Sequence, residues 1–309
     1  MADAAPPATL VGFVGLGRMG RPMCHNLLDA GYRIIVNDLR RQAGVGLEEL
    51  GAVWASSARE VAAGADLLVT MLPGPAEVEA VMTGPAGALG ALHRGATWFD
   101  MTTGSPALAE ELDRRCRTAG VSFLDAPVGG GPPAAAAGTL QIFAGGDGGV
   151  LDAHRELLGV LGDPARTVHF GPAGSGSTAK LLVNLLWFGQ ALATAEAFTV
   201  AAAAGIDLEV FRRAVVAGAA ASHFAEHDAP ALLGGDYLAS FSLARCRDEL
   251  AEVTDLGRRL GLDLAVTAVV GEVYDRAVQR YGDADGELLA VKLLEETTGI
   301  PLRHPAHGG

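Results

Sequence analysis

A glycine-rich turn with the spacing G-x-G-x-x-G, at residues 15–20, constrains the fold of this chain more than any other feature. It follows the apolar run Leu10–Val14, which predicts a β-strand, and precedes Arg21–Ala30, which has a helical pattern. In such a unit the first glycine allows a tight turn, the second lets the backbone approach a pyrophosphate, and the third allows close helix packing. An ordinary turn is the alternative in a chain with 42 glycines. The expected dinucleotide contacts are Gly15, Leu16, Gly17, Arg18, Met19 and Gly20.

The chain up to about residue 172 alternates short apolar runs with helical patterns. Such alternation predicts βαβ units and a mostly parallel, doubly wound α/β sheet of the Rossmann type. The predicted strands are Leu10–Val14, Arg33–Asn37, Leu67–Met71, Thr97–Asp100, Val121–Leu124, Leu140–Ala144 and Thr167–Phe170. The predicted helices are Arg21–Ala30, Gln42–Leu50, Ala58–Ala63, Pro75–Met82, Pro106–Ala119 and Leu151–Leu161. The segment Pro132–Ala137, rich in proline and alanine, predicts a loop or turn.

The strand signal ends after Gly176, and helical patterns follow it to the end of the chain. The length of 309 residues is enough for two domains. We therefore expect a flexible leader at residues 1–9, a dinucleotide-binding Rossmann domain at residues 10–172, and an all-helical domain at residues 173–309. The helical domain is expected to serve substrate binding and dimerisation.

One segment, Leu181–Ile206, is apolar enough to be compared with a membrane span. Its polar residues Asn184, Gln190 and Glu196 favour a soluble helix that is buried on several sides, so we expect no membrane partner. One small domain rarely buries such a helix completely. The sequence therefore predicts a homodimer or a higher homo-oligomer.

Composition narrows the function further. The net charge is −13 and no basic stripe is present, so nucleic acid is not an expected partner. The three cysteines are distant and odd in number, which argues against a disulfide framework and against a CxxC zinc site. The first residues lack the basic region of a signal peptide, so we expect a cytoplasmic enzyme with no metal.

The second predicted strand ends in an acidic residue, Asp38, at about the spacing where such folds bind a ribose 2′-hydroxyl. A carboxylate there favours NAD, because it would repel the 2′-phosphate of NADP. Arg40 and Arg41 follow directly and could bind that phosphate, so both cofactors stay open. A turn residue or a helix N-cap is the alternative for Asp38. The expected cofactor contacts of this segment are Asn37, Asp38, Leu39 and Arg40.

The run G-F-V-G-L-G-R-M-G-R-P-M, from Gly12 to Met23, resembles the opening of the β-hydroxyacid dehydrogenase family, which includes 3-hydroxyisobutyrate dehydrogenases and tartronate semialdehyde reductases. D-M-T-T-G-S-P, from Asp100 to Pro106, is similar to the D-x-S-T-x-x-P segment of that family. The resemblance implies that Thr103 lies near the nicotinamide, although this cluster fits a helix N-cap equally well. It also implies cofactor contacts at a Leu-Pro turn, here Met71, Leu72 and Pro73.

A second glycine run, Gly129, Gly130 and Gly131, follows the predicted strand that ends near Asp125. Its backbone N–H groups can receive a carboxylate, as in an anion nest, and a plain flexible loop is the alternative. The segment D-A-P-V-G-G-G resembles the family's substrate motif D-A-P-V-S-G-G. The serine of that motif is Gly129 here, so one hydroxyl contact to the substrate is missing.

A lysine and an asparagine, Lys180 and Asn184, lie four residues apart in an otherwise apolar helical segment, so they share one face. Lys180 either reaches solvent near the helix start or, with Asn184, faces the cleft between the domains. The segment is similar to the family's G-x-G-x-x-x-K-x-x-N-N, with Val183 in place of the first asparagine. Protonated Lys180 can stabilise a developing alkoxide and supply its proton, while Asn184 either holds the substrate oxygen or orients the lysine.

The last family segment, a helix containing K-D-L, is D-E-L here, so Asp248 replaces a lysine. Arg245 or Arg247 could substitute for it, although a solvated face is the simpler interpretation. The resemblance implies an NAD(P)-dependent oxidoreductase that interconverts a small β-hydroxyacid and its semialdehyde. The alternatives are an imine reductase, which Lys180 argues against, and a dinucleotide-binding scaffold with little catalysis.

Overall fold

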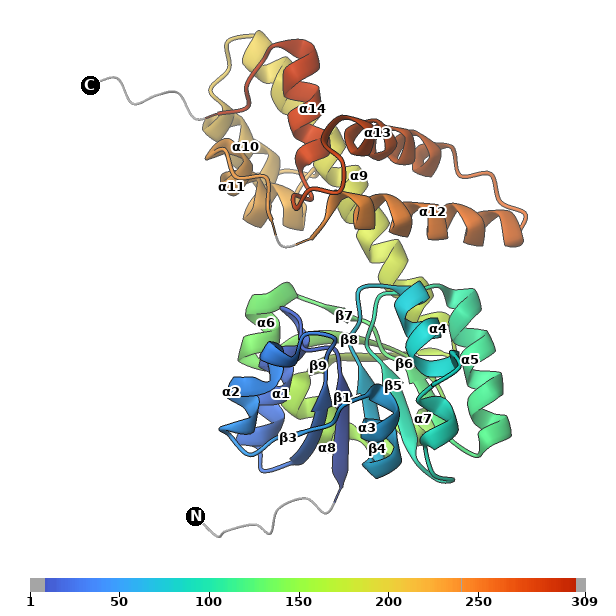
Figure 1. Cartoon of the computed structure of the whole chain (residues 1–309). Helices are drawn as coiled ribbons and strands as arrows, with labels where there is room; N and C mark the ends of the chain where they lie inside the picture. Colours follow the sequence, from blue (N-terminus) through green and yellow to red (C-terminus); the bar gives the residue numbers. More distant parts are fainter. Residues whose placement is uncertain (1–8, 240, 304–309) are drawn as a thin grey trace. The chain divides into compact units, whose positions relative to one another are not determined.

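The computed structural model of the chain describes residues 9–239 and 241–303. Residues 1–8 of the expected leader lie outside the described residues. The chain divides into two compact units, Met1–Lys180 and Leu181–Gly309, which are described separately (Figure 1).

Within the described residues, nine strands of the first unit form one sheet in the order β3-β2-β1-β4-β5-β6-β8-β7, with β9 paired to β8. The first six strands in this order are parallel, which is the doubly wound Rossmann arrangement that the sequence predicts. β8 runs antiparallel to β6 and β7, and β9 runs parallel to β8. The strands are β1 Leu10–Val14, β2 Arg33–Asn37, β3 Val53–Trp54, β4 Leu67–Thr70, β5 Thr97–Asp100, β6 Ser122–Asp125, β7 Val128–Gly129, β8 Leu140–Gly146 and β9 Gly162–Gly171.

Helices cover both faces of this sheet (Figure 1). α1, α2, α6 and α8 enclose one core with Phe13 and Leu67, whereas α3, α4 and α5 enclose a second with Leu68 and Trp98. The successive residues Leu67 and Leu68 are both buried because their side chains point to opposite faces. The helices are α1 Gly20–Asp29, α2 Val45–Glu48, α3 Ala58–Gly64, α4 Pro75–Thr83, α5 Pro106–Ala119, α6 Gly131–Ala137, α7 Gly148–Ala153 and α8 Arg155–Leu161.

The prediction of a loop at Pro132–Ala137 is wrong, because this segment is helix α6. Its prolines lie in the first turn, where the missing N–H groups are not needed, and its alanines are strong helix formers. Gly138, with φ of +65°, ends the helix in the left-handed conformation. The sequence also fails to predict the two-residue strands β3 and β7. His154 divides the predicted helix Leu151–Leu161 into α7 and α8.

The second unit is helical, and its central element is α9, Ser175–Ala203, whose first turns belong to the first unit. Two hydrophobic clusters pack on α9, one around Phe198 and Phe224, the other around Phe188 and Tyr274. The other helices are α10 Leu208–Ala217, α11 Ala229–Leu233, α12 Leu243–Arg259, α13 Ala265–Tyr281 and α14 Leu289–Thr298, with a π-helical turn at Phe224–Asp228.

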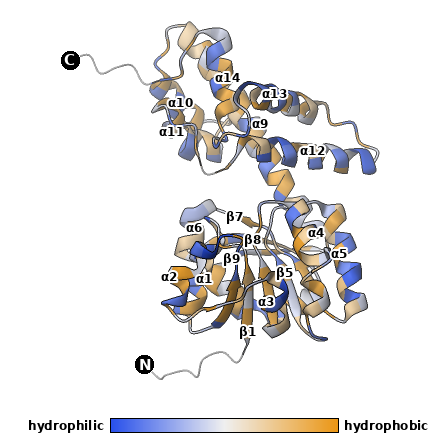
Figure 2. Ribbon diagram, viewed as in Figure 1, coloured by the Kyte–Doolittle hydropathy of each residue, from blue (hydrophilic) through white to orange (hydrophobic). Residues whose placement is uncertain are grey.

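α9 is long and apolar enough to cross a membrane by length and composition alone, and Figure 2 shows its apolar character. Only 28% of its most apolar window is buried within the structure. The exposed fractions of its outward side chains range from 43% to 69%, at Leu182, Val183, Leu186 and Val200. The expected burial of this helix on several sides is therefore incomplete within one copy of the chain.

Candidate active site

The glycine turn between β1 and α1 needs glycine at two positions. A Cβ at Gly15, which has φ of +99°, would lie 2.2 Å from the carbonyl oxygen of Met71. A Cβ at Gly20 would lie 1.9 Å from the carbonyl oxygen of Gly15. A Cβ at Gly17 would meet no atom within 4 Å, so the turn has open space in front of its middle glycine. This open backbone next to a helix N-terminus fits the pyrophosphate of a dinucleotide.

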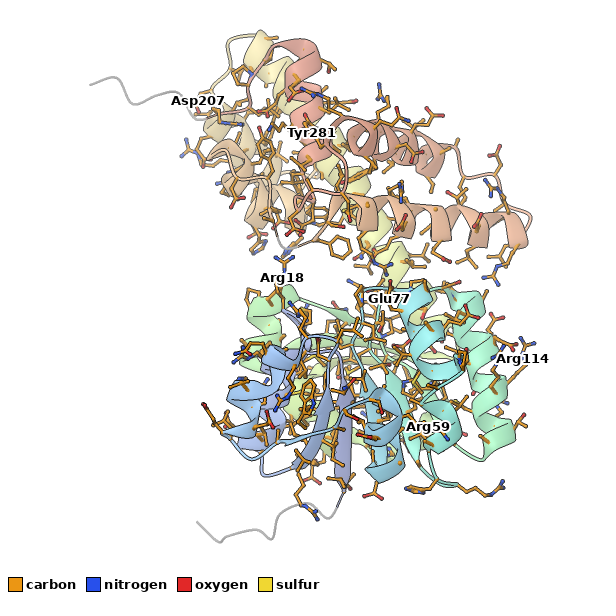
Figure 3. All side chains as sticks on the ribbon, in the orientation of Figure 1. Arg18, Arg59, Glu77, Arg114, Asp207 and Tyr281 are labelled. Carbon is orange, nitrogen blue, oxygen red and sulfur yellow. The ribbon has the colours of Figure 1, made fainter. Side chains whose placement is uncertain are left out.

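Asp38 lies beside this turn, as a ribose-binding carboxylate should. Its Oδ2 accepts a hydrogen bond from the backbone N–H of Leu16 at 2.8 Å, and its Oδ1 accepts one from the N–H of Arg40 at 2.8 Å. Leu39 is fully exposed, whereas Asn37 is buried and donates its side-chain amide to Ala55. The side chain of Arg18 extends from the glycine turn away from the sheet (Figure 3).

The turns after β4 and β5 are joined to one another. The backbone N–H of Leu72 donates to the hydroxyl of Thr102 at 3.0 Å, and that of Met71 donates to Val14 of β1. Met71–Pro73 and the segment that contains Thr103 therefore lie at the carboxyl ends of parallel strands, next to the glycine turn. Ligands of doubly wound sheets bind at this edge. Ser105 holds the N-cap position of α5 without a side-chain capping bond.

Two buried carboxylates, Asp100 and Asp125, end the neighbouring strands β5 and β6 in register. Asp100 accepts hydrogen bonds from the hydroxyl of Thr70 at 2.9 Å and from the N–H of Thr102 at 3.2 Å. The indole of Trp98 donates in turn to Thr70. Burial raises the pKa of Asp100 to about 6, and the hydrogen bonds from Thr102 and Thr70 oppose this shift. The sequence motif that contains Asp100 does not predict this network, because its members lie on different strands.

Asp125 holds the start of α9. Its Oδ1 accepts from the N–H of Gly174 at 2.9 Å, and its Oδ2 accepts from the N–H of Ser177 at 2.7 Å. Burial raises the pKa of Asp125, while these backbone hydrogen bonds lower it. A Cβ at Gly176 would lie 2.2 Å from the carbonyl oxygen of Phe143, so the first turn of α9 packs directly on β8. Asp125, at the end of β6, thus fixes the start of the helix that carries Lys180.

The second glycine run forms the junction of β7 and α6. Gly129 pairs with Gln141 of β8, and Gly130 and Gly131 have φ of +106° and +65°. A Cβ at Gly129 would lie 3.4 Å from the ring of Phe143. The amino group of Lys180 lies 5.8 Å from the centre of the same ring, within the range of a cation–π contact. Phe143 therefore connects Gly129 to Lys180, a role that no sequence motif indicates.

In the second unit, the side-chain amide of Asn184 donates to Oε2 of Glu249 at 2.6 Å. Glu249 is buried on α12, and the guanidinium of Arg245 lies 3.8 Å from its Oε1. Asp248 is instead exposed and pairs with Arg247 at 2.6 Å. The sequence motif points to Asp248 rather than to Glu249, because a contact between residues 184 and 249 leaves no local signal.

Within residues 9–239 and 241–303, no group of three or more histidine, cysteine or acidic side chains is arranged to hold a metal ion. The predicted catalytic and substrate-binding residues offer one amino group, one amide and backbone N–H groups. Such groups bind anions and move protons, and the glycine turn with Asp38 has the features of a nicotinamide dinucleotide site.

The strand order and the glycine turn define a dinucleotide-binding protein with an additional helical unit. A family model for the NAD binding domain of 6-phosphogluconate dehydrogenase matches residues 10–171, and one for the NAD-binding of NADP-dependent 3-hydroxyisobutyrate dehydrogenase matches residues 174–294. The chain belongs to the β-hydroxyacid dehydrogenase family, which confirms the resemblance seen in its motifs. It is an NAD(P)-dependent oxidoreductase that acts on the hydroxyl group of a hydroxyacid.

Similar proteins cover nearly the whole chain. The 2-hydroxy-3-oxopropionate reductase of Escherichia coli K12 is 32% identical over 92% of this chain and 97% of its own length. The 2-(hydroxymethyl)glutarate dehydrogenase of Eubacterium barkeri is 28% identical over 94% and 96%. The structure of a Mycobacterium tuberculosis 3-hydroxyisobutyrate dehydrogenase with L-serine has a TM-score of 0.83 at 29% identity, covering 93% and 99%. An imine reductase of Myxococcus stipitatus, with a TM-score of 0.61 at 22% identity over 92% and 99%, shares the fold alone.

Proposed function

We propose that this enzyme interconverts a small unphosphorylated β-hydroxyacid and its semialdehyde, with Lys180 as the general acid and base. The observation that carries the proposal is the placement of Lys180 over the ring of Phe143, which also packs against Gly129, with Asn184 one helical turn further along α9. Residues 10–172 bind the dinucleotide, and residues 173–309 serve substrate binding and dimerisation. The bound dinucleotide supplies the hydride acceptor or donor.

The other steps of the reaction are assigned to different residues of the chain. Lys180 accepts the hydroxyl proton during oxidation and returns it during reduction, which stabilises the charge that develops on oxygen. Asn184, oriented by Glu249, holds the substrate oxygen. The N–H groups of Gly129–Gly131 receive the carboxylate, without the family's serine hydroxyl. The glycine turn, Met71–Pro73 and Thr103 hold the dinucleotide.

NAD is the proposed cofactor, rather than NADP. Asp38 is held toward the glycine turn by Leu16, and its negative charge opposes a 2′-phosphate at that position. Arg40, one of the two nearby cations, contacts Asp38 through its side chain at 3.4 Å and is partly neutralised by it. A homodimer is also proposed, because the exposed apolar side chains of α9 need a covering surface. The proposed location is the cytoplasm.

The test of the catalytic role is Lys180→Met. The chain contains two lysines, so Lys292→Met in α14 is a matched control. Removal of a general acid and base costs about 10²- to 10⁴-fold in rate. We expect Lys180→Met to lose turnover by that factor while it binds NAD with unchanged affinity, and Lys292→Met to keep both.

The readout is nicotinamide absorbance with a panel of semialdehydes, hydroxyacids and cyclic imines, alongside calorimetric titration of the cofactor. Turnover by Lys180→Met at the wild-type rate would contradict the assignment. Binding without turnover of any panel member by the wild type would instead support the scaffold alternative.

A further inference from the structure

Arg41, the second arginine after Asp38, is held by two side chains of the same unit. Its guanidinium contacts both carboxylate oxygens of Glu48, with Nη1 to Oε2 at 2.7 Å and Nη2 to Oε1 at 3.1 Å. Its Cζ also lies 4.5 Å from the centre of the Trp54 ring, a cation–π contact. We call Arg41, Glu48 and Trp54 the arginine clasp.

The backbone next to the arginine clasp packs tightly against its indole. Gly44, in the 3₁₀-helix at Arg41–Gly44, packs against the indole: a Cβ there would lie 2.4 Å from Cε3 of Trp54 and 2.7 Å from Cζ3. Any larger residue would therefore move the ring. Trp54 also packs on the buried core of the first unit. The position of Arg41 is thus set by a fixed aromatic surface as well as by an ion pair.

The clasp changes what Arg41 can bind. The bidentate carboxylate occupies two of the guanidinium N–H donors that could otherwise bind a phosphate, and the guanidinium carbon lies over the indole ring. Arg40 is engaged with Asp38. NADP-binding folds place an arginine for the 2′-phosphate just after the second strand. Here both arginines at that position, Arg40 and Arg41, form ion pairs with carboxylates of the chain.

We propose that Glu48 and Trp54 form a second selectivity element for NAD, by withholding Arg41 from the 2′-phosphate of NADP. The inference rests on the proposed dinucleotide site and extends it. Asp38 repels the phosphate, and the clasp removes the cation that could attract it. Removal of Asp38 alone consequently leaves the enzyme with only part of the change needed to accept NADP.

Two adenosine fragments test this by calorimetry on the full chain: adenosine 2′,5′-bisphosphate, which carries the 2′-phosphate, and 5′-ADP, which does not. Asp38→Ser is the background, to which Glu48→Gln is added. Glu49→Gln is the matched control, because it removes the same charge one residue away and leaves the clasp intact. Arg41 and Glu48 are 55% and 32% exposed, so loss of the pair should cost little stability.

We expect Asp38→Ser/Glu48→Gln to bind the 2′,5′-bisphosphate about two- to fivefold more tightly than Asp38→Ser, the range of exposed charge pairs and cation–π contacts. The affinity for 5′-ADP should not change. Adding Arg41→Gln should cancel the gain, because the freed guanidinium is its source. Glu49→Gln, added to Asp38→Ser in place of Glu48→Gln, should give less than half of the gain in affinity for the 2′,5′-bisphosphate.

Equal gains from Glu48→Gln and Glu49→Gln would overturn the inference, since they would reflect net charge alone. A gain that survives Arg41→Gln would also overturn it. Failure of the wild type to bind 5′-ADP would be a different result, because it would remove the dinucleotide site itself. Binding of 5′-ADP with no response to Glu48→Gln would refute only the clasp.

Discussion

Asp100 shows how a single buried carboxylate affects this protein. It is held by Thr70 and Thr102 below the turn that carries Thr103, and it lies beside Asp125. Burial raises the pKa of Asp100 from 3.8 to about 6. The ionised form is therefore costly in the folded state, and the native protein holds a proton that the unfolded chain releases between pH 4 and pH 6. Asp100 thus favours folding most below the lower of these values and loses that contribution as the pH rises.

Asp100→Asn tests this at the residue scale. The variant keeps the acceptor oxygen but carries no charge, so it should gain free energy of unfolding relative to wild type as the pH rises from about 4 to about 6. The pKa difference corresponds to a gain on the order of 3 kcal/mol, constant above pH 7. Urea denaturation at pH 4.5 and pH 7.5 should show about 2 kcal/mol of this gain, because the carboxyl group of the unfolded chain is already mostly ionised at pH 4.5. If the free energies of unfolding of variant and wild type differed by the same amount at both pH values, the raised pKa of Asp100 would be contradicted.

At the scale of an element, the start of α9 decides where Lys180 lies. Gly176→Ala should disturb that start, because the new methyl group would lie 2.2 Å from the carbonyl oxygen of Phe143 and 2.7 Å from that of Asp125. We expect a loss of about 1–3 kcal/mol in stability, and a larger fractional loss in turnover than in NAD affinity. Denaturation and steady-state kinetics provide the two readouts.

Gly189→Ala is the control within the same helix. A Cβ there meets only Cγ2 of Val270, at 3.9 Å, so the substitution adds helix propensity without a clash. It should stabilise the protein by about 0.5–1 kcal/mol and leave turnover unchanged. If both alanine variants behaved alike, the tight packing of Gly176 on β8 would not matter to the site.

Local chemistry explains which elements are predictable from the sequence. The glycine turn and the parallel strands are predictable, because they depend on the absence of side chains at glycines and on runs of apolar residues. Both features can be seen among residues that are close in sequence. α6 was missed because prolines at Pro132 and Pro133 break a helix in its interior but not in its first turn. β3 and β7 are two residues long and exist only through pairing with β2 and β8. The contacts of Phe143 and Glu249 with the proposed catalytic residues likewise depend on packing between distant segments.

At the scale of the whole molecule, the exposed apolar side chains of α9 predict self-association. Leu186 is 61% exposed in the middle of the helix, and a stable interface covers about 800 Å² per partner. Leu186→Glu would place a charge in that interface, so we expect it to convert the dimer into a monomer. Light scattering coupled to size-exclusion chromatography measures the mass. Leu50→Glu is the control, because it places a charge at an exposed leucine of the first unit, and it should leave the mass unchanged. If the wild-type protein has the mass of a monomer, the proposed dimer is excluded.

The boundary of the two compact units falls inside α9, between Lys180 and Leu181. A crossover between two related genes at that point would join the first six residues of α9 from one parent to the rest of the helix from the other. Lys180 and Asn184 would then come from different parents. The two family models instead meet between residues 171 and 174, before the helix begins. The second family model therefore contains the whole of α9 together with the helices that follow it as far as residue 294. Chimeras of this family should be joined ahead of Ser175, so that the proposed catalytic pair always comes from one parent.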